Sequence, residues 1–476
     1  MGCGVTSRVA ALVIGGGISG LVCAHALRKA GVDALVVEAS GCAGGAVRTE
    51  RRDGYLLELG PQSFSGTTQM LQLFDDLGIR QHVVQAPAGA PRYVLVNGKL
   101  QKVPMSPPAF LTSGFVGLGT KFAVFRDLIG KSTPPEQDES IASFVRRKFS
   151  ATMLDRLVGP FVSGVYAGDP ERLSLRSAFP MLHDAEKRKG SVIRGLFSRA
   201  EKQNPDQPRQ RPTLLNFREG TQTFSDALAA KLGDRLLLNT SVQNLALDRS
   251  EPALTFRVTA QVGQEQRSFI AEHVIVATPT DVAAALLRGI EPIASDRLAE
   301  IEYAPIAVVS LAFQKDKVGD PLHGFGFLLP RSAGIRTLGT VWNTSLFPNR
   351  APESDVLLTS FVGGATDPQA TQLSSEELVA MVEREIGPLV GIRQDAAAGR
   401  SKHRPYKSDF SNVTVYPHAL PQYNLGHGER LAAIDQSLKN HPNLDLIGNY
   451  LTGPSIGSCV ERSLWVAEQI IRRQNP

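Results

Sequence analysis

The first forty residues alternate between short apolar runs and a glycine-rich turn. Val9 to Ile14 is an apolar run of the length of a buried strand. From Ser19 to Ala30 apolar residues recur at helical spacing, and Ala34 to Val37 is a second short apolar run. The pattern therefore predicts a strand, a helix and a second strand at the start of the chain.

Three glycines join the first strand to the helix in the spacing G-x-G-x-x-G: Gly15, Gly17 and Gly20. Gly15 permits the tight turn, Gly17 lets a pyrophosphate approach the backbone, and Gly20 lets the helix lie close to the strand. The anion would then bind the free N–H groups at the helix N-terminus, in Ile18 and Ser19. The alternative is a glycine-rich turn without a ligand.

An acid completes the pattern. Glu38 ends the second apolar run about twenty residues after the glycines, where a carboxylate accepts the ribose hydroxyls of an adenosine. It is followed by Ala39 and Ser40 rather than by a basic residue, so a 2′-phosphate is not expected. Strand, glycines, helix, strand and acid in this order predict a Rossmann-like dinucleotide-binding domain.

The rest of the chain shows two further patterns, a broken apolar stretch and a series of short apolar runs. The expected fold class is therefore α/β for the first part combined with α+β for the rest. Residues 104–129 are apolar but interrupted by Gly and Pro, and short apolar runs between 307 and 362 predict a mixed sheet. The polar, proline-rich stretch 203–212 is typical of a linker. We expect a discontinuous Rossmann-like domain (1–88, 225–297 and 437–476), a mixed-sheet substrate domain (89–103, 195–224 and 298–436) and a small helical domain (104–194).

Composition narrows the class of protein. The chain has 476 residues, a formal net charge of +5 and four cysteines, which are Cys3, Cys23, Cys42 and Cys459. The charge is mild and spread along the chain, which argues against a nucleic-acid partner but is compatible with an anionic membrane surface. No pair of cysteines has the spacing of metal ligands, so we expect a reducing compartment, no disulfide and no metal site.

Signals for targeting are few. No apolar run reaches the roughly twenty residues that cross a bilayer, and the first strand leaves no room for a secretory signal. Residues 107–125 are apolar enough to rest in a membrane interface, with plain core residues as the alternative. We expect a cytoplasmic protein that associates peripherally with a membrane. Gly2 and Cys3 also fit a lipidation pattern, which applies only in a eukaryotic cell.

A glycine doublet follows the acid. Gly44 and Gly45, with Arg48 and Thr49, resemble the GG-x-x-R-T motif of flavoprotein oxidases in the amine oxidase and phytoene desaturase superfamily. The doublet offers a second close backbone approach, and the arginine a cation for the pyrophosphate; alone, Arg48 would read as a solvated surface residue. Residues 58–61 also resemble that superfamily, in which Gly60 and Pro61 would pass near the isoalloxazine ring. The resemblance implies FAD rather than NAD as the cofactor.

Further contacts with FAD are implied by the same resemblance. The backbone of Val242 would meet the adenine, and Ala277 belongs to an A-T-P turn shared by the superfamily. A C-terminal helix, predicted from about Cys459 to Ile471, would aim its positive N-terminus at the C2 carbonyl edge of the flavin. Three residues around that helix complete the expected cofactor set: Gly448, Ile456 and Val460.

The stretch Gly159–Pro170 contains G-V-Y-A-G-D-P and resembles the oxygen-dependent protoporphyrinogen oxidase family, in particular its plant-type branch. By composition alone it would be a turn-rich loop. In the family this block, with Gly168, lines the substrate cavity. The resemblance also implies that Arg92 binds a propionate and that Phe347 and Leu328 sandwich the tetrapyrrole; without it, both apolar residues would read as core.

The expected activity is that of an FAD-dependent oxidase. It would convert protoporphyrinogen IX to protoporphyrin IX in three two-electron steps, reducing dioxygen to hydrogen peroxide, without a recognisable general base. Oxidation of coproporphyrinogen III, another flavoprotein amine oxidase or desaturase, and a non-catalytic FAD scaffold remain alternatives. The expected partners are the tetrapyrrole, dioxygen, a membrane surface, a second copy in a homodimer, and a ferrochelatase or magnesium chelatase that receives the product.

Overall fold

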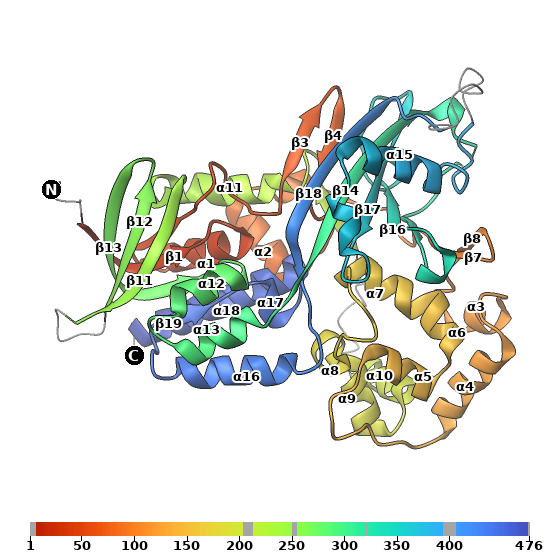
Figure 1. Cartoon of the computed structure of the whole chain (residues 1–476), viewed down its shortest axis with the longest axis horizontal. Coiled ribbons are helices and arrows are strands. Elements are labelled where there is room, and N and C mark those ends of the chain that lie inside the picture. The colour runs from red at the N-terminus through yellow and green to blue at the C-terminus, as the bar shows by residue number, and fades with distance from the viewer. Residues whose placement is uncertain (1–5, 203–212, 250–254, 320, 394–405, 475–476) are drawn as a thin grey trace.

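The protein is mixed α/β with several sheets. The computed structural model describes residues 6–202, 213–249, 255–319, 321–393 and 406–474. Within these residues there are two seven-stranded sheets, a three-stranded sheet and a two-stranded hairpin. Figure 1 shows the N-terminal sheet and its helices at one end, the second large sheet beside them, and a lobe of helices below that sheet. The predicted linker at 203–212 and the predicted lipidation site lie outside the described residues.

The first large sheet is built around the N-terminal strand. Its order is β10-β2-β1-β13-β12-β11, and β19 pairs with the end of β13. Strands β10, β2, β1, β13 and β19 are parallel, while β12 and β11 form an antiparallel extension. The strands are β1 (Thr6–Ile14), β2 (Ala34–Val37), β10 (Leu236–Leu237), β11 (Thr240–Asp248), β12 (Thr255–Val262), β13 (Glu265–Val276) and β19 (Leu444–Leu446).

Helices cover both faces of this sheet. One face carries α1 (Ile18–Lys29), α2 (Thr68–Leu77), α11 (Gln222–Leu232) and α18 (Ile456–Gln474). The other face carries α12 (Thr280–Leu287), α13 (Pro292–Ala299) and α16 (His427–Leu438). The predicted strand–helix–strand unit is thus confirmed as β1, α1 and β2. Strands β10 and β11 are separate, because Asn239 adopts a left-handed conformation between them, with φ of 51°.

The second large sheet has the order β18-β14-β17-β16-β15-β7-β8. All its pairs are antiparallel except β15 with β7. Helix α15 (Ser375–Ile386) covers one face, where the apolar core of this domain lies. The strands are β7 (Arg92–Val96), β8 (Lys99–Lys102), β14 (Tyr303–Gln314), β15 (Gly326–Leu328), β16 (Thr337–Trp342), β17 (Asp355–Gly363) and β18 (Phe410–Pro421).

Short elements connect the two sheets. The hairpin β3 (Thr49–Arg52) and β4 (Tyr55–Glu58) follows the glycine doublet. A small sheet joins β5 (Phe64–Ser65), β9 (Leu214–Phe217) and β6 (Val83–Gln85). Helix α14 (Asn343–Leu346) follows β16, and α17 (Asn449–Thr452) follows β19.

The helical lobe lies below the second large sheet in Figure 1. Its core joins α5 to α9, and it contains a buried charge cluster in which Lys148 pairs with Asp127 and Glu186. The elements are α3 (Pro107–Thr112), α4 (Leu118–Ile129), α5 (Ile141–Lys148), α6 (Ala151–Met153), the π-helical turn η2 (Leu154–Val158), α7 (Gly159–Tyr166), α8 (Leu175–Ala178), α9 (Pro180–Lys189) and α10 (Val192–Lys202).

Two stretches differ from the sequence-based expectation. The first half of Gly159–Pro170 is helix α7 rather than loop, since it continues the turns of α6 and η2 before Ala167 ends it in a left-handed conformation. Residues 195–224 lie outside the strands of the second sheet: α10 packs on α4 and α9, and β9 pairs with β5 and β6. The domain boundaries, including the place of 195–224 in the substrate domain, stay a prediction.

Candidate active site

The glycine turn between β1 and α1 has the geometry that a pyrophosphate needs. Gly17 caps α1 without a side-chain hydrogen bond to the first turn, so the amides of Ile18 and Ser19 face no capping side chain. A Cβ atom at Gly17 would meet no other atom within 4 Å, so space lies open there. A Cβ atom at Gly20 would lie 2.0 Å from the carbonyl oxygen of Gly15, so only glycine lets the helix approach the strand.

The glycine doublet lies against this turn. The amide of Gly44 donates to the carbonyl oxygen of Gly16 (2.8 Å), and a Cβ atom at Gly45 would be 3.3 Å from the Cα of Gly17. Gly44 and Gly45 have φ of 106° and 61°, which favours glycine at both positions. Arg48 follows them with an exposed side chain. The two glycine motifs therefore form one backbone cradle with a cation beside it.

Glu38 stands at the end of β2, beside the first glycine turn. Its carboxylate accepts hydrogen bonds from the amide of Gly16 (2.6 Å) and from the amide (2.8 Å) and hydroxyl (2.7 Å) of Ser40. Its backbone carbonyl accepts from the amide of Thr240, which brings the start of β11, with half-buried Val242, alongside it. A carboxylate offers about four acceptor sites, so capacity remains for ribose hydroxyls.

The carboxyl ends of three parallel strands bring the other predicted cofactor residues together. Gly15 follows β1, Ala277 follows β13 and Gly448 comes two residues after β19. A Cβ atom at Gly15 would lie 2.8 Å from the carbonyl oxygen of Ala277. Ile456 and Val460 belong to α18, which begins at Ile456 rather than near Cys459 and packs against α1. Ligands of open α/β sheets bind at this edge.

The turn after β4 is attached to the glycine doublet. The amide of Leu59 donates to the carbonyl oxygen of Arg48 (3.0 Å). A Cβ atom at Gly60 would lie 2.0 Å from the carbonyl oxygen of Ala46, so Gly60 must be glycine at this contact. Pro61 follows, half-buried. The segments 44–48 and 58–61 therefore form one continuous surface.

Strand register places Arg92, Leu328, Phe361 and Tyr416 on one face of the second large sheet. This is the face opposite α15. Arg92 is exposed at one end of it, with its guanidinium 5.3 Å above the ring of Phe325. Leu328, Phe361 and Tyr416 are half-buried apolar or aromatic residues. The result is a largely apolar wall with a cation at its rim.

At the opposite end of this wall, the charge of Arg48, which follows the glycine doublet, acts on Tyr416. Burial raises the pKa of Tyr416, and the nearby Arg48 guanidinium partly offsets that rise. The wall therefore runs from the predicted pyrophosphate cation, Arg48, to the predicted substrate cation, Arg92. A flat substrate bound along this face would have one edge at the cofactor and the other at Arg92.

The two predicted clamp residues lie in different parts of this region. Phe347 is buried, with 3% of its surface exposed, and packs with Val341 near Phe361. Leu328 is half-buried and faces α7, where a Cβ atom at Gly164 would lie 2.6 Å from its Cδ2 atom. The structure does not bring Phe347 and Leu328 into direct contact within one apolar cluster. Phe361 lies nearer the centre of the wall, and sequence reasoning missed it although it sits in an apolar strand pattern.

Gly168 lies in the loop that joins α7 to α8 within the helical lobe. A Cβ atom there would lie 2.5 Å from the Cδ1 atom of Leu173 and 3.0 Å from the Oε1 atom of Gln422. The Nε2 group of Gln422 donates to the carbonyl oxygen of Tyr166 (2.9 Å), which ties this loop to β18 and α16. Gly168 is therefore needed for close packing between the lobe and the two large sheets.

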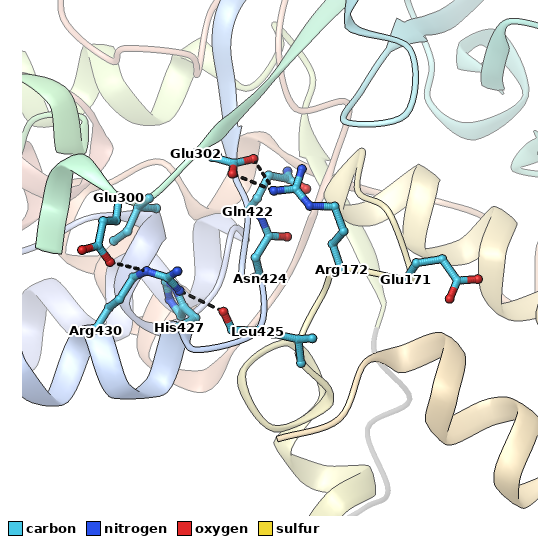
Figure 2. A pocket seen from close by; sticks show the side chains of 10 residues that line it. Glu171, Arg172, Glu300, Glu302, Gln422, Asn424, Leu425, His427 and Arg430 are labelled. Carbon is cyan, nitrogen blue, oxygen red and sulfur yellow. Dashed lines mark hydrogen bonds and ion pairs between the residues drawn. The ribbon is translucent and has the colours of Figure 1, made fainter. Parts of the chain in front are cut away.

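A separate cavity of about 230 Å³ lies next to that loop. Figure 2 shows Arg172 directed at Glu302 and Arg430 directed at Glu300, so ion pairs from three parts of the molecule line it. Among its buried residues, His427 has its pKa lowered to about 4, chiefly because burial disfavours the charged form. The cavity is polar and lies apart from the glycine cradle, so we do not assign the cofactor to it.

Other types of site are not found in the described part of the chain. No cluster of three or more His, Cys, Asp or Glu side chains there could hold a metal ion. Cys23, Cys42 and Cys459 are free thiols. A glycine cradle at the carboxyl edge of a parallel sheet, an uncapped helix N-terminus and an adjacent acid match a dinucleotide-binding site. This is the architecture of a flavoprotein oxidoreductase.

Comparison with known proteins agrees with this class. A family model described as flavin containing amine oxidoreductase matches residues 18–471. The chloroplastic protoporphyrinogen oxidases of Oryza sativa subsp. japonica and Nicotiana tabacum are 35% and 32% identical to the chain. The matches cover 98% of this chain and 89% and 86% of those proteins. The chain belongs to the flavin containing amine oxidoreductases and, among them, to the protoporphyrinogen oxidase family. It is an oxidoreductase, and its cofactor is FAD.

One curated relative and two solved structures match the chain at lower sequence identity. The coproporphyrinogen III oxidase of Staphylococcus aureus is 27% identical over 96% of this chain and 98% of its own length. A crystal structure from Exiguobacterium sp. 255-15 matches with a TM-score of 0.79 and 22% identity, covering 98% of this chain and 99% of that one. The cyclohexylamine oxidase of Brevibacterium oxydans IH-35A matches with a TM-score of 0.71 and 18% identity, covering 98% and 100%. These two structures show the shared fold.

Proposed function

We propose that the protein oxidises protoporphyrinogen IX to protoporphyrin IX. The observation that carries the proposal is the wall between Arg48 and Arg92, which is apolar along its length and cationic at its far rim. A flexible macrocycle with propionates on one edge matches that distribution. A guanidinium binds a carboxylate with two parallel hydrogen bonds, which fixes orientation as well as affinity.

The reaction removes six hydrogens from the macrocycle, so three dioxygen molecules become three hydrogen peroxide molecules. The glycine turn, the glycine doublet and Glu38 would hold FAD, which would supply the chemistry of hydride acceptance and of electron transfer to dioxygen. The protein supplies position: Arg92 would hold the propionate while the wall orients the ring toward the cofactor. In this proposal Leu328 and Phe347 contribute apolar contacts to the substrate, and Gly168 shapes the side of the substrate site that faces the helical lobe.

Coproporphyrinogen III is the second candidate substrate, because the Staphylococcus aureus relative also matches almost the whole chain. It carries four propionates and would benefit from additional cations along the wall. Arg92 is exposed at the rim, whereas Leu328 and Phe361 are apolar, which favours the substrate with fewer charges. The same wall disfavours a small amine as substrate.

The test is anaerobic bleaching of the flavin by each porphyrinogen, followed by kcat/KM for both. We expect a ratio that favours protoporphyrinogen IX. A ratio that favours coproporphyrinogen III would change the substrate and keep the chemistry. If neither porphyrinogen bleaches the flavin, the protein is a different oxidase or a non-catalytic flavoprotein.

Peripheral association with a membrane is part of this proposal. Helices α3 and α4 expose apolar side chains together with Arg126, and Lys121 is half-buried beside them. No helix in the described residues is both long enough and apolar enough to cross a bilayer. A homodimer and transfer of the product to a chelatase stay predictions. The exposed apolar residues of this surface are Met105, Leu111, Leu118, Phe122, Phe125, Leu128 and Ile129.

A further inference from the structure

Residues 343–350 form a short segment that carries Phe347 and is held at both of its ends. It consists of helix α14 and the turn that follows, and the amide of Phe347 donates to the carbonyl oxygen of Asn343 (3.1 Å). Both anchoring contacts lead to residues 56–62, the strand and turn beside the cofactor cradle. The contacts join residues nearly three hundred positions apart in the sequence.

The first anchor is a buried amide pair. The Nδ2 group of Asn343 donates to the Oε1 atom of Gln62 at 2.7 Å, and both residues are buried. Gln62 in turn donates from Nε2 to the carbonyl oxygens of Glu58 (2.9 Å) and Gly60 (3.0 Å). Gln62 therefore connects the backbone of the flavin-side turn directly to the start of the segment.

The second anchor is at Arg350. Its guanidinium is 1% exposed, lies 3.8 Å from the carboxylate of Glu58 and donates to the carbonyl oxygen of Phe217 (3.0 Å). Its own carbonyl oxygen accepts from the amide of Leu56 (3.0 Å). The same guanidinium lies 5.4 Å from the centre of the Phe347 ring. Burial lowers the pKa of Arg350, and the charge of Glu58 partly offsets that change.

Glu58 is itself fixed to the cofactor side. Its buried carboxylate accepts hydrogen bonds from the hydroxyl groups of Thr49 and Thr221, both at 2.7 Å. Thr49 directly follows Arg48, whose carbonyl oxygen accepts from the amide of Leu59. A continuous path of hydrogen bonds therefore leads from the glycine-doublet segment, through residues 58–62, to residues 343–350.

We propose that Gln62, Asn343, Glu58 and Arg350 are positioning residues that transmit FAD occupancy to the segment carrying Phe347. FAD bound at residues 44–48 and 58–61 restrains the turn, and the two anchors pass this restraint to the segment. The role of Phe347 toward substrate rests on the proposed function, whereas the coupling between cofactor and segment does not.

The first experiment measures hydrogen–deuterium exchange of the amides in residues 344–350, in apo protein and in FAD-loaded protein. We expect FAD to slow this exchange at least fivefold in the wild type and less than twofold in Asn343→Leu and in Arg350→Met. Each variant removes one anchor, so the coupling can still be tested if one of the two variants does not fold. The coupling is overturned if FAD slows exchange of the segment in both variants as strongly as in the wild type. It is also overturned if FAD does not slow this exchange in the wild type.

Arg331→Met is the matched control. Arg331 is a partly buried arginine of the same domain that donates to the carbonyl oxygens of Arg336 (3.1 Å) and Gly363 (2.9 Å). Its loss tests the general effect of removing such a guanidinium. We expect FAD to protect residues 344–350 in this variant as it does in the wild type. Loss of protection in Arg331→Met as well would show that the anchors have no special role.

The second experiment measures the rate of anaerobic flavin reduction by saturating protoporphyrinogen IX, corrected for FAD content. We expect it to fall at least tenfold in Asn343→Leu and Arg350→Met, and less than twofold in Arg331→Met. Unchanged rates in the two anchor variants would overturn the positioning role. If no porphyrinogen reduces the wild-type flavin, the proposed function fails, and the exchange experiment still decides the coupling.

Discussion

Gly17 is a single residue on which cofactor binding depends. Its missing side chain leaves open space beside the uncapped start of α1, where the pyrophosphate is expected. Gly17→Val should occupy that space and weaken FAD binding at least a hundredfold, since the cofactor and the new side chain would overlap. Flavin content after purification and titration of the apo protein measure this.

Gly114→Val is a suitable control for that change, because a Cβ atom at Gly114 also meets nothing within 4 Å, but in the distant helical lobe. It should keep its FAD. A yellow Gly17→Val protein with normal affinity would contradict the assignment of the glycine turn.

Arg92 is the residue on which substrate affinity should depend. It is exposed above the ring of Phe325, so it can reach a carboxylate without leaving a buried charge unpaired. Removing a charged hydrogen bond costs roughly 1.5–3 kcal/mol, so Arg92→Ala should raise KM for protoporphyrinogen IX by roughly 10- to 150-fold with a smaller change in kcat.

The exposed Lys99 on the adjacent strand β8 provides the comparison for Arg92. Lys99→Ala removes a cation from the same sheet and should leave KM within a factor of about two. Equal KM values in wild type and Arg92→Ala would remove Arg92 from the site.

At the scale of elements, the start of α16 should give the protein a dependence on pH. His427 stacks on Tyr423 with ring centroids 4.6 Å apart, and its Nε2 atom lies 3.0 Å from the carbonyl oxygen of Tyr450. Its pKa falls from 6.5 to about 4, first because of burial; Arg430 lowers it further, whereas the bond to Tyr450 opposes this. The unfolded state therefore binds more protons between pH 6.5 and about 4.

The free energy of unfolding should consequently decrease as pH falls through that window, by roughly 3 kcal/mol for this one group. His427→Gln cannot titrate, so its melting temperature should change less between pH 7 and pH 4.5 than that of the wild type. Thermal denaturation at several pH values measures the difference. Parallel curves for the two proteins would show that His427 is not responsible.

Helix α4 illustrates what periodicity can and cannot predict about an element. Its apolar residues at helical spacing predict the helix, but they do not say which of them are covered. On this helix Ala123 is 6% exposed, while its neighbour Phe122 is 67% exposed. Only the packing of α4 on α5 and α10 separates the two kinds of residue.

At the scale of the whole molecule, the exposed apolar surface of α3 and α4 leads to a prediction about membranes. Phe122→Glu with Phe125→Glu places two carboxylates where apolar side chains are now 67% and 54% exposed. If this surface rests in a membrane interface, the double variant should float with anionic liposomes far less than the wild type, since charged groups are costly to insert.

Trp465→Glu is the control for the membrane experiment. Trp465 is 49% exposed on α18, in another part of the molecule, so its substitution should not alter flotation. Equal flotation of wild type and double variant, or flotation of neither, would show that α3 and α4 are not the anchor.

The sequence by itself determined the local parts of this protein. The first strand, the helix and the second strand were predicted correctly, because their residues lie within forty positions and their spacing is imposed by the turn itself. The roles of the glycines and of Glu38 in binding the cofactor stay predictions. The family resemblance of the glycine doublet likewise identified FAD. Short apolar runs between 307 and 362 likewise predicted the strands of the second large sheet, whereas composition missed the helix within residues 159–170.

Only the tertiary structure decided which distant residues meet. The charge of Arg48 acts on Tyr416, and Asn343 donates to Gln62 across 281 positions, yet neither interaction leaves a period or spacing in the chain. Phe347 is buried because other elements cover it, not because its own neighbours are apolar. Hydrogen bonds and burial between separate elements depend on how those elements pack, and local patterns of hydrophobicity carry no record of that packing.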